Sequence, residues 1–184
     1  MLYKGKYRVE TARLQGHDYA DPGWYFVTIC TRDHACVLGQ VIAGQLNLTP
    51  AGLIAQQCLH HICGITSHVT LDAQVIMPNH VHAIIVLEPR ATEGSVTSPC
   101  RASAPPPDMS VISPRPGSLA ALVRSYKAAV TRRCANRGFG DLLWQGRYYD
   151  HIIRNDDELN RIRAYMANNV VQWEQDALHP EWHG

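Results

Sequence analysis

The stretch VTLDAQVIMPNHVHAIIVL, residues 69–87, decides how the rest of the chain is interpreted. Residues 69–77 alternate apolar and polar side chains, which predicts a strand with one wetter face. Pro78 and Asn79 predict a turn, and the apolar residues that follow predict a second, buried strand. Because alternate residues of a strand face the same side, His80 and His82 share one face. Two imidazoles so placed form half of a metal site or of a polar pocket.

Signals for strands and helices alternate on both sides of this stretch. Strands are predicted at 24–31, at 35–49 (two short pieces around Gly44) and at 142–154, and helices at 49–62, 118–138 and 156–173. Thr49, Ser118 and Asn155 supply side-chain oxygens where N-caps are needed. Strands with interposed helices and hairpins predict an α+β sandwich, in which helices pack on one mostly antiparallel sheet.

Length and composition favour one ordinary globular domain. The 184 residues are 46% apolar and 18% charged, with a net charge of +1. We find no apolar run long enough to span a bilayer and no secretion signal, and the six cysteines form no C-x-x-C pair. These features predict a reduced, cytoplasmic protein without a membrane partner. Seven of the eleven prolines fall within residues 89–117, so we expect a flexible insertion there.

Tyr165 and Asn169 are candidates to complete a site with the two histidines. They lie four residues apart on the last predicted helix, so they share one edge of it. An amide oxygen suits Mg²⁺ or Mn²⁺, and imidazole accepts Mn²⁺ or zinc. Two histidines and one amide oxygen could hold a divalent ion with positions left open for a substrate. A neighbouring phenol could then attack a metal-polarised phosphorus atom.

Positive charge is concentrated in one part of the chain. Between Ser118 and Arg147 there are six lysines and arginines against one acidic residue. A second basic stretch near the N-terminus includes Lys4, Lys6, Arg8 and Arg13. Such clusters are typical of surfaces that contact phosphates, but also of the solvated face of an amphipathic helix.

Together these segments resemble a known family. His80-Val81-His82 is a His-hydrophobic-His (HUH) motif, and Tyr165 with Asn169 matches the tyrosine helix of single-tyrosine HUH transposases. The stretches YFVTICT, VIMPNHVHAIIVL, LVRSYKAAVTR, LWQGRYYDHIIRNDDEL and IRAYMANN occur in the family's order. Over about residues 24–173, apart from the proline-rich insertion, the chain resembles the REP-associated tyrosine transposases, a branch of the insertion-sequence transposases.

The resemblance implies a single HUH transposase domain over residues 1–184 with a ferredoxin-like (RRM-like) fold. It implies cleavage and rejoining of single-stranded DNA near hairpins, with Tyr165 forming a 5′-phosphotyrosine link and His80, His82 and Asn169 holding Mg²⁺ or Mn²⁺. The expected DNA contacts are Arg13, Arg124, Lys127, Arg132 and Arg147. A bacterial protein of this kind would associate with the nucleoid when bound to DNA, as a monomer or a homodimer. The family commonly has Asn-Pro where this chain has Asn169-Val170, so we expect its helix to continue for another turn.

Other interpretations stay open at this point. A domesticated protein could bind hairpin DNA without cutting it, and a metal-dependent phosphoesterase could use the histidines without Tyr165. A histidine in a strand can be a hydrogen-bonded core residue, and Asn169 can be an ordinary left-handed helix cap. Tyr148, Tyr149 and His151 form a rival group, in which we expect Tyr149 to lie mostly in the core.

Overall fold

The structure is a computed structural model, and it describes residues 18–65, 67–89, 114–140 and 144–180. Arg13 and most of the proline-rich insertion, residues 90–113, lie outside the described residues. Within the described ranges, no helix is both long enough and apolar enough to cross a membrane.

A four-stranded sheet forms the centre of the fold. Its strands are β1 (Gly23–Cys30), β4 (Val69–Ile76), β5 (His80–Leu87) and β6 (Tyr149–Ile153), in the spatial order β4-β5-β1-β6 with every neighbouring pair antiparallel. Helix α1 (Pro50–Ile65) connects β1 to β4, and helix α2 (Leu119–Asn136) connects β5 to β6. This β-α-β-β-α-β order with β1 and β5 in the middle is the ferredoxin-like arrangement. The predicted α+β fold with an antiparallel sheet is therefore confirmed.

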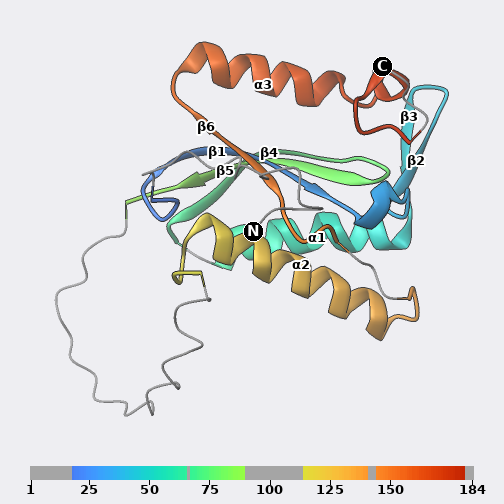
Figure 1. The fold of residues 1–184 in the computed structure, drawn as a ribbon, viewed down its shortest axis with the longest axis horizontal. Helices are drawn as coiled ribbons and strands as arrows, with labels where there is room; N and C mark the ends of the chain where they lie inside the picture. Colours follow the sequence, from blue (N-terminus) through green and yellow to red (C-terminus); the bar gives the residue numbers. More distant parts are fainter. Residues whose placement is uncertain (1–17, 66, 90–113, 141–143, 181–184) are drawn as a thin grey trace, which may run out of the picture.

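Helices cover both faces of the sheet (Figure 1). The main core lies between the sheet and the pair α1 and α2, and it includes Val27, Ile85 and Tyr126. On the opposite face lies helix α3 (Asp156–Asn168), which buries Leu159 and Met166 against Phe26 and Ile84. His80 and His82 belong to this second face, so they lie under α3 and not in the main core.

Local signals placed most element boundaries correctly. The Ser118 hydroxyl accepts a hydrogen bond from the Ala121 amide, and the Asn155 carboxamide oxygen accepts one from the Glu158 amide. The predicted pair of short strands around Gly44 is a separate hairpin of β2 (Gly39–Ile42) and β3 (Gln45–Leu48). Gly44 has a φ of 73°, a backbone conformation that glycine adopts without steric cost.

Two predicted boundaries are wrong. Of the strand expected over 142–154, only Tyr149–Ile153 forms a regular strand, β6. Trp144 pairs with Thr31 in an isolated β-bridge. The helix expected over 156–173 ends at Asn168, and the chain then turns into the 3₁₀ segment η2 (Trp173–Gln175). This turn brings Trp173 inward, where its ring is buried 6.1 Å from the His80 ring. Burial of a large aromatic side chain explains why the helix does not continue.

Candidate functional site

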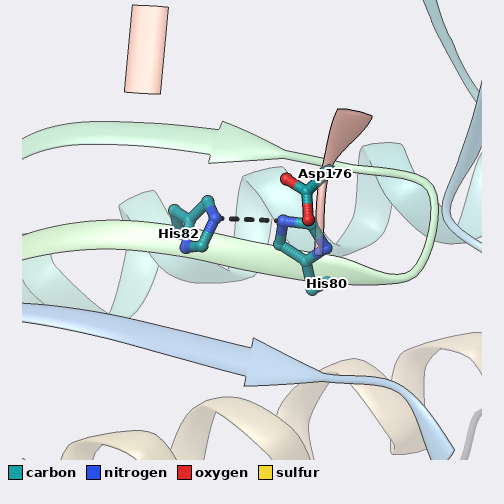
Figure 2. A group of neighbouring side chains, drawn as sticks. All are labelled: His80, His82 and Asp176. Atoms are coloured by element: carbon teal, nitrogen blue, oxygen red, sulfur yellow. Dashed lines mark hydrogen bonds between the residues drawn. The ribbon is translucent and has the colours of Figure 1, made fainter. Parts of the chain in front are cut away.

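His80 and His82 form the centre of the candidate site, on the face of β5 that α3 covers. Both are buried, and their Nε2 atoms lie 3.0 Å apart. Figure 2 shows the two rings side by side on the strand, with the line between their facing nitrogens. The strand alternation that predicted a shared face is therefore confirmed.

The surroundings of His80 determine which ring nitrogen is protonated. The Asn79 amide nitrogen donates hydrogen bonds to the carbonyls of His34 and Leu178, so the Asn79 side-chain oxygen is directed toward His80. This oxygen lies 2.8 Å from His80 Nδ1, which must donate to it. The lone pair of the neutral ring is then on Nε2, the atom that faces His82. A hydrogen bond of this kind at Nδ1 is what orients a metal-ligating histidine.

His82 is held in the same manner by β1. Its Nδ1 lies 2.8 Å from the hydroxyl of Thr28, the residue directly opposite in the β1–β5 pairing. A hydroxyl can donate or accept, so Thr28 permits either tautomer of His82. When Nδ1 carries the proton, two Nε2 lone pairs face each other across 3.0 Å, an arrangement that a cation between them would stabilise.

Asp176 completes a group that could hold a metal ion, and the sequence analysis missed it. Its carboxylate and the two imidazoles offer ligand atoms that all lie within 4.8 Å of one another. Figure 2 shows the Asp176 side chain entering beside His80 from the segment that follows η2. Asp176 is 8% exposed, and its two oxygens accept hydrogen bonds from the Leu178 amide and from the Asn169 side chain. No periodic pattern surrounds Asp176 in the sequence, so no local signal pointed to it.

Asn169 lies at the end of α3 with its side chain directed into the same site. Its Nδ2 donates to Asp176 Oδ2 at 2.9 Å, which fixes the orientation of the amide. Its Oδ1 is buried, and no described group meets the geometry of a hydrogen bond to it. The backbone has a φ of −59°, so Asn169 is not a left-handed cap. A buried acceptor without a donor is unusual in a folded protein, and it suits an oxygen that would bind a cation.

Tyr165 joins this group from the last turn of α3. Its hydroxyl lies 3.3 Å from His82 Nε2, and its ring packs edge-on against Phe26. The side chain is 44% exposed, so one side of the phenol is open to solvent. Partial burial and the nearby Asp176 charge raise the pKa of Tyr165, while the Asn169 side chain lowers it. The hydroxyl is therefore protonated at neutral pH.

Both histidines are neutral at neutral pH. Burial lowers the pKa of His80 to about 3, with a further decrease from the neighbouring His34 and an opposing contribution from Asn169. Burial and the proximity of His80 lower the pKa of His82 to about 3, which Asp176 partly offsets. Neutral imidazoles have the lone pairs that metal ligands need.

Three of the five predicted DNA contacts lie together on α2. Arg124, Lys127 and Arg132 on α2 line a hollow of about 590 Å³ with Arg32 and Trp144, which we call the basic hollow. Lys127 also donates hydrogen bonds to the carbonyls of Gln145 and Arg147, so two of its three N–H groups are already used. The Arg147 side chain is exposed but does not line this hollow.

The rival residues on β6 face the same side of the sheet as the histidines. Tyr149 is 50% exposed, so the expectation that it lies mostly in the core is wrong. It stands opposite Thr28, which stands opposite His82. His151 Nε2 contacts the carboxylate of Glu158 at 2.7 Å, which ties β6 to the start of α3. β6 is one of the two edge strands of the sheet, and the Tyr149 ring at its start is half exposed.

Comparisons with known proteins give one sequence relative and a matching fold. No family model matches the chain. A Haemophilus influenzae protein described only as uncharacterized is 34% identical over 175 residues, which span 95% of this chain and 95% of that protein. A solved structure of a REP-associated tyrosine transposase bound to a REP hairpin has a TM-score of 0.55 and 16% sequence identity, and it covers 94% of this chain and 91% of that one. At this identity, the likeness to the solved structure shows a shared fold.

Proposed function

Because the chain belongs to the family of the Haemophilus influenzae protein and shares the fold of a REP-associated tyrosine transposase, we propose that it is a single-stranded DNA transposase. The resemblance carried by its sequence motifs is thus matched by its fold. The proposed substrate is single-stranded DNA next to a hairpin. The observation that supports this best is the position of the Tyr165 hydroxyl, 3.3 Å from one of two paired, buried histidines.

In the proposed reaction, the Tyr165 oxygen attacks the phosphorus of a phosphodiester. The new bond joins the tyrosine to the 5′-phosphate, the bond from phosphorus to the 3′-oxygen breaks, and the phenolic proton leaves to solvent as the 3′-oxygen gains one. The link conserves the energy of the phosphodiester, so attack by another 3′-hydroxyl reverses the step without a nucleotide cofactor. The open side of Tyr165 supports access of a strand, because a buried phenol could not reach a phosphate.

The residues around Tyr165 fit a divalent cation, which we propose to be Mg²⁺ or Mn²⁺. The donors are two imidazole nitrogens, the Asp176 carboxylate and the Asn169 amide oxygen, to which no described group donates with the geometry of a hydrogen bond. A separation of 3.0 Å between the histidine nitrogens suits neighbouring ligands on a cation with bonds of about 2.1 Å. Mixed nitrogen and oxygen donors suit Mn²⁺, and the two oxygens also suit Mg²⁺. Such an ion supplies Lewis-acid polarisation of the scissile phosphate.

We propose that DNA reaches this site by way of the basic hollow. Arg124 and Arg132 supply positive charge there, and Trp144 supplies an aromatic surface. Lys127 binds the 145–147 segment by its hydrogen bonds, so we assign it mainly to positioning that segment. Arg147, exposed beside it, and Arg13 remain proposed phosphate contacts, although Arg13 lies outside the described residues.

A covalent-capture experiment tests the proposed function. The full chain is incubated with Mn²⁺ and a labelled single strand that contains a hairpin, and denaturing gels detect a protein–DNA adduct. We expect Tyr165→Phe or EDTA to abolish the adduct, because each removes a part of the proposed chemistry. Tyr19→Phe, which alters a tyrosine outside the site, is the matched control and should retain it. An adduct that survives Tyr165→Phe would overturn the assignment and make Tyr149 the next candidate.

Hairpin binding without an adduct, insensitive to EDTA and to His80→Ala, would instead support a non-catalytic DNA-binding protein. Hydrolysis of a small phosphoester by the Tyr165→Phe variant would support a phosphoesterase. A transposase should give neither result. The same wild-type and variant proteins therefore distinguish the three functions.

A further inference from the structure

A second hollow lies beside Tyr165, between β6 and α3. It has a volume of about 360 Å³, and we call it the strand-edge hollow. Its lining includes Phe26, Tyr149, His151, Glu158, Arg161 and Tyr165. Sites for small organic groups in proteins have volumes of about 300–1,000 Å³. The reaction proposed above assigns no role to this hollow, although Tyr165 forms part of its wall.

Tyr149 gives the strand-edge hollow an exposed aromatic surface. Tyr149, Thr28 and His82 occupy one row across three neighbouring strands, because each stands opposite the next in the β-pairing. The Tyr149 ring is therefore on the same face as the proposed cation ligands and about two strand spacings, roughly 10 Å, from His82. Half of its surface is open to solvent. Aromatic rings so exposed beside a nucleic-acid path stack on bases.

Arg161 gives the same hollow a positive charge. The charge of Arg161 acts on the nearby Glu158 carboxylate, but among the described residues its guanidinium forms no hydrogen bond or ion pair. The neighbouring Glu158 does not neutralise it by direct pairing, because the Glu158 oxygens accept from His151 Nε2 at 2.7 Å and from the Arg154 amide at 2.8 Å. The guanidinium is therefore available for a phosphate, and each oxygen of the Glu158 carboxylate already accepts one hydrogen bond.

We propose that the strand-edge hollow binds the nucleotide adjacent to the scissile phosphate. The base stacks on the ring of Tyr149, and Arg161 contacts the backbone phosphate of that nucleotide. This inference rests on the proposed function, since it assumes that Tyr165 marks the point of cleavage. Because stacking uses the face of a base and not its edge, the hollow requires a base but discriminates little among the four.

Binding of short single strands in EDTA tests the hollow without requiring cleavage. The probes are a labelled ten-nucleotide deoxyadenosine strand and an abasic strand of the same length and charge, titrated with the full chain and followed by fluorescence anisotropy. We expect Tyr149→Ala to weaken binding of the deoxyadenosine strand about 5- to 150-fold, the effect of losing one stacked base. Binding of the abasic strand should not change. Tyr149→Phe should bind the deoxyadenosine strand as tightly as the wild type does, because it keeps the aromatic ring.

Phe139→Ala is the matched control, because Phe139 is a similarly exposed aromatic residue that does not line the hollow. Equal losses for both strands, or no loss for either, would overturn the inference. If the adduct of Tyr165 forms while Tyr149→Ala has no base-dependent effect, only this inference is refuted. If the base-dependent effect is found but no adduct forms, the hollow binds DNA and strand transfer is refuted. Absence of binding to either strand refutes both.

Discussion

Two neutral imidazoles buried beneath α3 make the metal-free protein sensitive to mild acid. Burial lowers the pKa of His80 and of His82 to about 3, whereas an unfolded histidine has a pKa of 6.5. Below pH 6.5 the unfolded chain therefore binds more protons than the folded chain, and the free energy of unfolding decreases as the pH falls towards 3. Between pH 7.5 and pH 5, each imidazole lowers this free energy by about 2 kcal/mol, and the pair by about 4 kcal/mol.

Urea unfolding in EDTA at the two pH values, followed by circular dichroism, measures this effect. In His80→Gln/His82→Gln, the loss of stability between pH 7.5 and pH 5 should be about 4 kcal/mol smaller than in the wild type, because groups common to both proteins cancel. In His82→Gln alone, the loss of stability between pH 7.5 and pH 5 should be about 2 kcal/mol smaller than in the wild type. His61→Gln, at an exposed histidine, is the matched control and should keep the wild-type dependence. The reasoning is refuted if the wild type and the double variant lose the same stability.

Three further predictions concern the cation and the DNA. Thr28→Val removes the hydroxyl that orients His82 and should weaken Mn²⁺ binding about 10- to 100-fold in calorimetry, whereas Thr70→Val, on the exposed part of β4, should not. Asp176→Asn should weaken Mn²⁺ binding more than Thr28→Val does, because it removes a negative charge among the proposed ligands. An affinity equal to that of the wild type would exclude Asp176 as a ligand. Arg124→Gln should lower the slope of log affinity for hairpin DNA against log salt concentration by about 1, and an unchanged slope would exclude Arg124 as a phosphate contact.

The parts of the site that could be predicted from the sequence depend on local geometry. The shared face of His80 and His82 follows from strand alternation, and the cap at Asn155 follows from one side chain and the helix that it starts. The ferredoxin-like order followed from the family resemblance together with the alternation of strands and helices. For the histidine pair and the Asn155 cap, the decisive residues are close in the sequence, so their relative positions do not depend on how distant segments pack.

The parts that could not be predicted depend on tertiary packing. Asp176 reaches the histidines because the chain turns after Asn168 to bury Trp173, and no repeating pattern in the sequence marks that turn. Tyr149 was expected to lie mostly in the core, but half of its surface is exposed, and it lines the hollow between β6 and α3. Which side chains are covered at the edge of a sheet is decided by the placement of a helix from elsewhere in the chain.

The order in which the proposed ligands are synthesised has a consequence in the cell. The histidines emerge from the ribosome with β5, whereas Asp176 follows after α2, β6 and α3 have been made. A translation product that stops just after α3 would retain the strands and both imidazoles but would lack the carboxylate. Prematurely terminated chains of this length would therefore bind the proposed cation more weakly than the full chain does.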